Sequence, residues 1–250
     1  MRKRSSKKRK RFLHRIKIFA GILFLGMPVC FYLVNQRISE ERTPESILSQ
    51  MESYTENKQD EAQEKSTPTP VSEYYTIMGN TTVTLDNMTR LFERRNVDYP
   101  YWALEAGGAG TLEDFCRIIL EESEKETVRA EVVFAQAMLE TGWLQYGGDS
   151  HIEQFNFAGL GTTGGGEPGN AYPDVRTGIR AQVQHLKAYA SSEELNEDCV
   201  DDRFPFVQRE SAPYVEWLGI QENPYGCGWA AGEDYGYKIL ALIEEIKKTK

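Results

Sequence analysis

The sequence Phe134-Ala-Gln-Ala-Met-Leu-Glu-Thr-Gly-Trp143 is the stretch on which the interpretation of this chain depends. It is a mostly apolar helical segment, and Gly142 predicts where the helix ends, because glycine readily adopts the left-handed conformation of a helix terminus. Glu140 then falls in the last turn, where the helix dipole disfavours a negative charge. Apolar neighbours on both sides would also exclude water from its carboxyl group. Both effects raise the pKa of a carboxylic acid.

A raised pKa would let Glu140 keep its proton near neutral pH and donate it to a leaving oxygen atom. Perturbed carboxyl groups cluster at functional sites, which favours this interpretation. The alternative is an ordinary surface glutamate near a helix end. The residues that follow in the sequence favour the first interpretation.

Helical hydrophobic spacing recurs on both sides of this stretch. Thr111 and Asp114 form an N-terminal cap pair for one of these helices, and the β-branched residues of 81–85 predict a short strand. Residues 192–230 are expected to form an irregular crossing. The predicted helices cover residues 84–92, 111–122, 127–141, 176–191 and a C-terminal helix that begins near 235 and includes 246.

Two further blocks follow the first, Gln154-Phe-Asn-Phe-Ala-Gly-Leu-Gly161 and Ala171-Tyr-Pro-Asp-Val-Arg-Thr-Gly-Ile179, with a Gly- and Thr-rich loop between them. Glycine lets backbone approach a ligand closely. Aromatic rings can stack on the apolar faces of sugars, and an asparagine amide can both donate to and accept from an acetamido group. A plain flexible loop with core aromatics is the alternative.

The order A-x-x-E-T-G-W, F-N-x-A-G-L-G and Y-P-D-V-x-x-G-I resembles the glucosaminidase family, glycoside hydrolase family 73. Its members are cell-wall enzymes that cleave the glycan of peptidoglycan after N-acetylglucosamine. The resemblance covers about Thr127 to Ile246. It implies a mainly α (α+β) fold, a lysozyme-like helical domain with a small Gly-rich lobe. Lytic transglycosylases and goose-type lysozymes carry a similar Glu before Ser/Thr-Gly-Trp, so the three blocks together carry the resemblance.

The resemblance implies roles for individual residues. Glu140 would be the general acid, and the second acid would be Glu167, with Asp174 as the runner-up. Asp149 and Glu153 are also candidates, and the 2-acetamido group of the substrate could act in place of a protein nucleophile. The Gly-rich lobe is shorter than in many relatives, which puts the second acid in doubt. The residues expected to bind substrate are Trp143, Asn156, Phe157, Gly159, Tyr172, Trp229 and Tyr235.

The N-terminal part of the 250-residue chain has a separate character. Residues 1–17 contain ten Lys or Arg and no acid. The net charge of the whole chain is −9, so subtracting these ten positive charges leaves residues 18–250 with a net charge of −19. Residues 18–34 are an uncharged apolar run near the lower limit of about 17 residues for a membrane span. Residues 35–72 have linker composition. A cleaved signal peptide is the alternative, but no small-residue cleavage site follows the run.

These features predict a basic cytoplasmic tail (1–17), a transmembrane anchor (18–34), an extracellular linker (35–72) and a catalytic domain (73–250). The positive-inside rule would leave the catalytic domain outside the cell membrane, facing the wall. The net negative charge of residues 18–250 would repel nucleic acid, so no nucleic-acid partner is expected. The three histidines are scattered along the sequence, so no metal site or cofactor is expected. Three cysteines lie outside the apolar run, and because this number is odd, no complete disulfide framework is expected.

The sequence therefore predicts a peptidoglycan hydrolase, an endo-β-N-acetylglucosaminidase, whose partners are glycan strands and the cytoplasmic membrane. Two alternatives stay open. One is a lytic transglycosylase or muramidase of the same fold, and the other is a non-catalytic peptidoglycan-binding protein.

Overall fold

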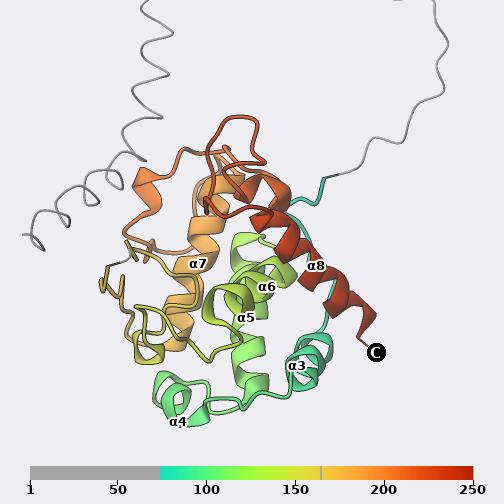
Figure 1. The fold of residues 1–250 in the computed structure, drawn as a ribbon, viewed down its shortest axis with the longest axis vertical. Helices are drawn as coiled ribbons and strands as arrows, with labels where there is room; N and C mark the ends of the chain where they lie inside the picture. Colours follow the sequence, from blue (N-terminus) through green and yellow to red (C-terminus); the bar gives the residue numbers. More distant parts are fainter. Residues whose placement is uncertain (1–73, 164, 250) are drawn as a thin grey trace, which may run out of the picture. The chain divides into compact units, whose positions relative to one another are not determined.

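Helices packed around the central α6 (Ala130–Thr141) form the part of the chain that the structure describes (Figure 1). The structure is a computed structural model, and it describes residues 74–163 and 165–249, which belong to a single unit, Ser72–Lys250. The other α-helices are α3 (Leu85–Arg94), α4 (Tyr101–Leu104), α5 (Leu112–Glu126), α7 (Val175–Ala190) and α8 (Tyr235–Lys248). Short 3-10 helices are η1 (Glu105–Gly107), η2 (Ile152–Gln154), η3 (Phe204–Phe206) and η4 (Val215–Leu218).

α6 is the core helix because it is buried on nearly every side. All residues from Ala130 to Met138 are buried, including Glu131 and Gln136. α5 and α8 both pack on α6, and α5 also contacts α3 and α7 (Figure 1). A helix that is apolar all round needs such cover from several partners. This packing fixes the C-terminal end of α6, and with it Glu140.

The helix boundaries follow local sequence rules. Thr111 and Asp114 form the predicted capping box at the start of α5, with Asp114 N–H donating to Thr111 Oγ1 over 3.1 Å. Gly142 ends α6 with φ 57°, as its position predicted. The predicted strand at 81–85 is wrong: Thr84 instead caps α3 through Asn87. A side-chain cap of this kind favours the helix over an extended continuation.

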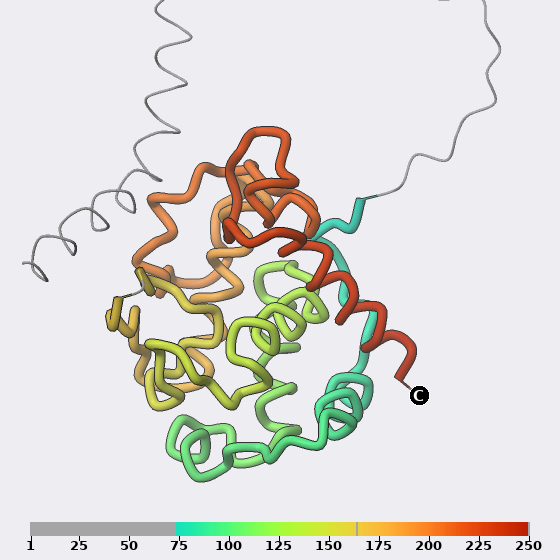
Figure 2. Tube along the Cα trace, in the orientation of Figure 1, coloured from blue at the N-terminus to red at the C-terminus, as the bar shows by residue number. Residues whose placement is uncertain are grey.

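β-structure is limited, among the described residues, to isolated bridges such as Thr76 with Tyr214 and Gly219 with Ala230. The observed architecture is therefore mainly helical, consistent with a lysozyme-like helical domain, and the α+β expectation is not met. Residues 142–163 and 165–174 follow a largely irregular path between the end of α6 and the start of α7 (Figure 2). This path contains the predicted Gly-rich lobe.

A buried ion cluster joins α5 to α7. Glu122 is 1% exposed and accepts hydrogen bonds from Arg176 (2.7 Å), Arg180 (2.7 Å) and Lys125 (2.9 Å). Burial alone would raise the pKa of Glu122, but the hydrogen bonds from its three cations outweigh burial and lower the pKa to about 2. Glu122 is therefore a charged structural residue.

No helix within residues 74–163 and 165–249 has the length and apolar content to cross a membrane. The basic segment 1–17, the apolar run 18–34 and the linker 35–72 lie outside the described residues.

Candidate active site

Glu140 projects from the last turn of α6 into a cavity of about 480 Å³, called the Glu140 cavity. The turn is closed by the backbone N–H groups of Gly142 and Trp143, which both donate to Met138 O. The side chain of Glu140 keeps an exposed face toward this cavity. The cavity is lined by Glu140, Thr141, Gly142, Tyr146, Gly147, Gly148, Asp149, Ser150, Asn156, Ala158, Gly159, Thr162, Trp229 and Ala230.

A chain of buried side chains holds the carboxyl group of Glu140 from behind. Gln182 Nε2 on α7 donates to Gln136 Oε1 over 3.0 Å, and Gln136 Nε2 donates to Tyr235 Oη over 3.0 Å. The Tyr235 hydroxyl in turn donates to Glu140 Oε1. Gln136 and Gln182 are both 0% exposed and Tyr235 is 7% exposed. Three helices, α6, α7 and α8, thus fix one carboxyl oxygen.

The direction of these hydrogen bonds leaves only one oxygen of Glu140 without a hydrogen bond from Tyr235. Since Tyr235 Oη accepts from Gln136, its single proton is free to point at Glu140 Oε1. Oε2 is left on the side of Gly159, where an added Cβ would lie 3.9 Å from it. Gly159 has φ 64°, a conformation in which glycine is favoured. The backbone conformation at position 159 therefore favours glycine, whereas an added Cβ would make only an ordinary contact with Oε2.

Glu140 has a carboxyl group suited to holding a proton. Burial raises its pKa above the ordinary value, and the hydrogen bond from Tyr235 offsets part of that increase. Burial also raises the pKa of Tyr235 well above its ordinary value, and the charge of Glu140 adds to the effect. Among residues 74–163 and 165–249, no ion pair involves Glu140. A carboxylic acid without a cation can act as a proton donor.

Asn156 organises the loop in front of Glu140. Its Nδ2 donates to Leu160 O (2.8 Å) and Asn170 O (3.1 Å), and its Oδ1 accepts from the N–H groups of Leu160 (3.0 Å) and Ala158 (3.4 Å). Both donors and both acceptor positions of the amide are therefore used within the protein. In this position Asn156 shapes the cavity wall and has no amide group left for an acetamido ligand.

The four candidate second carboxylates occupy different places. Asp149 lines the Glu140 cavity, and its Oδ2 accepts from Gly166 N–H over 3.0 Å. Asp174 caps α7 by accepting from Thr177 N–H over 2.7 Å and lines a separate cavity beside Gly107 and Arg117. Glu167 is exposed on the Gly-rich loop and does not line the Glu140 cavity, and Glu153 lines a neighbouring cavity. The structure thus brings only Asp149 to the same cavity as Glu140.

The aromatic candidates divide between cavity and core. Trp229 lines the Glu140 cavity and packs edge-on against His185, with ring centroids 4.8 Å apart. Phe157 is fully buried against Phe115, so the expectation that its ring contacts a sugar does not match its position. The reason is that Phe157 fills the space between the loop and α5.

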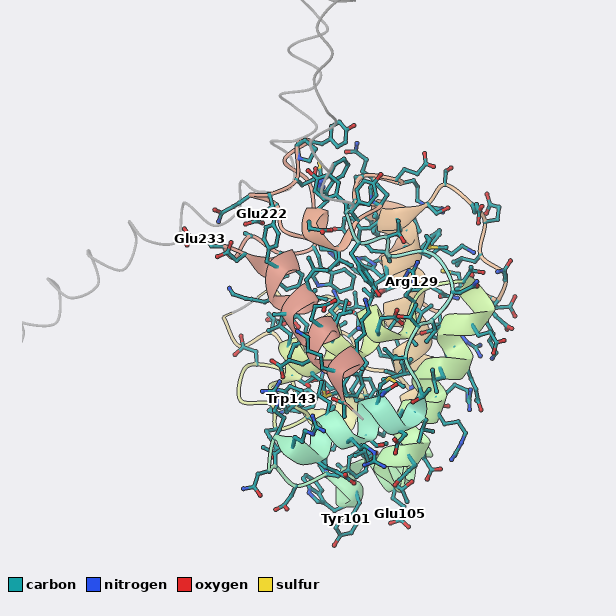
Figure 3. All side chains as sticks on the ribbon, turned by 90° about the vertical axis from the view of Figure 1, so that its right-hand side faces the viewer. Tyr101, Glu105, Arg129, Trp143, Glu222 and Glu233 are labelled. Atoms are coloured by element: carbon teal, nitrogen blue, oxygen red, sulfur yellow. The ribbon has the colours of Figure 1, made fainter. Side chains whose placement is uncertain are left out.

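Trp143 and Tyr172 lie off the cavity wall. Trp143 packs on Phe92 with centroids 6.1 Å apart, and the Arg95 guanidinium lies 4.3 Å above its ring (Figure 3 labels Trp143). Tyr172 is half-buried against a small cluster made by Ala158, Leu160 and Ala181. Both rings hold the loops that flank the cavity.

Sequence reasoning missed Gln136 and Gln182. Each is a polar residue on a helix face that is otherwise buried, and this pattern was the available signal, since buried polar side chains require hydrogen-bond partners. Within the described residues, no three His, Cys, Asp or Glu side chains gather as a metal site would need.

A mainly helical domain with a glutamic acid that lines a cavity and, within the described residues, makes no ion pair is consistent with a lysozyme-like glycoside hydrolase. The profile of the Glucosaminidase family, described as mannosyl-glycoprotein endo-beta-N-acetylglucosaminidase, matches residues 116–248. The chain belongs to this family. It is also 36% identical over 127 residues to an uncharacterized protein of Borreliella burgdorferi, a match that covers 51% of this chain and 59% of that protein.

Proposed function

We propose that this protein is an endo-β-N-acetylglucosaminidase that cleaves peptidoglycan glycan strands, with Glu140 as the general acid. The observation that carries the proposal is the Glu140 carboxyl group itself. It faces a cavity of about 480 Å³, makes no ion pair with any residue that the structure describes, and accepts a hydrogen bond from Tyr235, which does not line the cavity. Membership of the Glucosaminidase family supports peptidoglycan as the substrate class.

The proposed reaction begins with transfer of the Glu140 Oε2 proton to the glycosidic oxygen. The bond between that oxygen and C1 of the N-acetylglucosamine unit then breaks, and positive charge develops at C1. Water adds to C1 and loses a proton, which restores the acid. The products are one chain with a new reducing N-acetylglucosamine end and one chain with a free hydroxyl group.

The developing charge at C1 needs a stabilising group, and Asp149 is supported by its position on the same cavity wall. Glu167 and Asp174 stay proposals for this role, but neither lines the Glu140 cavity. The substrate's acetamido group is the other candidate. Asp149→Asn with unchanged activity would favour the acetamido group, whereas a loss above 100-fold would favour Asp149.

The test of the proposed function is product analysis. The full chain is incubated with purified peptidoglycan, the products are reduced with borohydride, and the new ends are identified by mass spectrometry. Reduced N-acetylglucosamine ends that are absent with Glu140→Gln support the proposal. Anhydromuramic ends would indicate a lytic transglycosylase. Wall binding without any cleavage by the wild type would indicate a binding protein.

The proposed location is the outer face of the cell membrane. The apolar run 18–34 after ten basic residues supports an anchor with its N-terminus inside, and the linker 35–72 would give the catalytic domain reach toward the wall. Protease treatment of intact spheroplasts should remove the domain while leaving a protected N-terminal fragment. Full protection of the domain in intact spheroplasts would contradict this location.

A further inference from the structure

A second and larger cavity, of about 870 Å³, borders the Glu140 cavity and is called the Trp102 cavity. The two share four lining residues, Tyr146, Gly147, Gly148 and Ser150, so they are adjoining parts of one hollowed surface. The far wall of the Trp102 cavity comes from residues 98–102. This segment lies outside the region 116–248 that matches the family.

Two large aromatic side chains are exposed on this wall. Tyr101 is 62% exposed and Trp102 is 66% exposed, and neither makes a ring contact or a side-chain hydrogen bond with the residues that the structure describes. Figure 3 shows Tyr101 at the edge of the molecule, close to Glu105. Two exposed aromatic side chains on the wall of one cavity are informative because grouped apolar surface of this kind marks ligand-binding grooves.

The backbone beneath these rings is held firmly in place. Tyr101 and Trp102 form the first half of α4. The second half, Ala103 and Leu104, is buried, with 6% and 0% exposure. Leu104 N–H donates to Pro100 O over 3.2 Å, and α4 also contacts η2. The rings are therefore presented on an anchored turn, which reduces the entropy that a ligand must offset on binding.

We infer that the Trp102 cavity is a binding subsite for amino-sugar units of the glycan strand beyond those next to Glu140. This inference rests on the proposed function. A polymeric substrate must continue past the bond that is cut, and the Trp102 cavity shares four lining residues with the cavity where cutting is proposed. Aromatic rings bury the apolar face of a pyranose while its hydroxyl groups stay hydrated.

The charges of the cavity restrict the ligand class. Its wall includes the acids Asp98 and Glu153, and no Lys or Arg lines it. An anionic polymer such as a phosphate chain would be repelled, whereas an uncharged N-acetylated sugar would not. A glycan strand therefore fits better than an anionic wall polymer.

The experiment compares short and long ligands in the catalytically silent background Glu140→Gln, using the full chain. The probes are the trimer and hexamer of β-1,4-linked N-acetylglucosamine, and affinities are measured by calorimetry. Adding Trp102→Ala should weaken hexamer binding about tenfold, as expected for one lost aromatic platform. Trimer binding should change less than twofold, because a trimer can be held at the Glu140 cavity alone. Phe206→Ala, which removes an aromatic ring that is 77% exposed elsewhere, is the matched control and should change neither affinity.

Equal hexamer affinities with and without Trp102 would overturn the inference, as would a failure of the Glu140→Gln parent to bind the hexamer. Equal losses for trimer and hexamer would also overturn it, because Trp102 would then act on the Glu140 cavity. Weaker binding to whole peptidoglycan without weaker hexamer binding would assign the cavity to peptide stems instead. The difference in hexamer affinity caused by Trp102→Ala can be measured even if the wild type cleaves nothing. Failure of the proposed function and failure of this subsite are therefore separate results.

Discussion

Glu122 and Glu140 lie in two regions of the same helical domain and have opposite surroundings. Glu122, between α5 and α7, is 1% exposed and hydrogen-bonded by Arg176, Arg180 and Lys125. Glu140, at the end of α6, faces a cavity and accepts its hydrogen bond from the uncharged Tyr235. The pKa of Glu122 is lowered to about 2, because the bonds from its cations outweigh burial, whereas burial raises the pKa of Glu140.

The comparison shows that burial by itself does not define an acid catalyst. Both carboxyl groups lose water, and the charge of the nearest donors decides whether the ionised form is stabilised. Cations fix Glu122 as a permanent anion that joins two helices. A neutral phenol fixes the position of Glu140 while leaving it able to carry a proton.

The largest expected effect is on catalysis. Glu140→Gln should reduce cleavage of peptidoglycan about 1,000-fold, because general acid catalysis typically contributes 10²- to 10⁴-fold. Reducing ends released per unit time measure the loss, and circular dichroism checks the fold. The matched control is Glu105→Gln, an exposed glutamate that does not line the Glu140 cavity. Comparable activity of the two variants would remove Glu140 from the mechanism.

The next largest effect is on stability. Glu122→Gln should lower the free energy of unfolding by about 2 kcal/mol, because it removes the buried charge that accepts hydrogen bonds from three partly exposed cations. Urea denaturation measures the loss. The neighbouring Glu121 is 44% exposed and, within the described part of the chain, pairs with Arg176 alone, so Glu121→Gln should cost less than 1 kcal/mol. Equal costs for the two variants would show that the buried cluster has no special weight.

A smaller effect is expected at Tyr235. Tyr235→Phe removes the hydrogen bond that favours the ionised form of Glu140, so the pKa of Glu140 should rise further. The alkaline limb of the activity profile should then move to higher pH, with a rate loss of about tenfold from looser positioning. The variant also leaves Gln136 Nε2 without its acceptor, at a cost of about 1–2 kcal/mol. Tyr237→Phe, on the exposed side of α8, should leave the profile unchanged.

The smallest effect concerns stability against pH. The folded-state pKa of Glu140 is raised, so its ionisation destabilises the folded state above the unfolded pKa of about 4.3. Glu140→Gln should therefore raise the melting temperature at pH 7, and this gain should vanish at pH 3, where the wild-type acid is protonated in both states. A gain that grows toward acid pH would reverse the assigned direction of the pKa shift.

Much of the helical framework was predictable because its signals are local. The capping box at Thr111 and the terminating Gly142 depend on residues a few positions apart. The same local rule explains the error at 81–85, where the cap at Thr84 outweighs the strand preference of neighbouring β-branched residues.

The partners of Glu140 were not predictable in the same way. Tyr235 lies 95 positions from Glu140, and Gln136 lies 99 positions from Tyr235, so only the packing of α8 on α6 brings them together. The family resemblance pointed to Tyr235 as a residue of the sugar groove, but not to its role behind the acid. Phe157 shows a second limit, since an aromatic residue type does not distinguish a core position from a cavity wall.

The most direct test of the central claim is a carbon-detected NMR titration of the glutamate carboxyl groups. The Glu140 signal is assigned by its disappearance in Glu140→Gln, and the Glu122 signal by its disappearance in Glu122→Gln. Glu140 should titrate above the ordinary glutamate pKa of about 4.3, and Glu122 should titrate well below it. A Glu140 signal that titrates at or below the ordinary value would contradict the assignment of Glu140 as the proton donor.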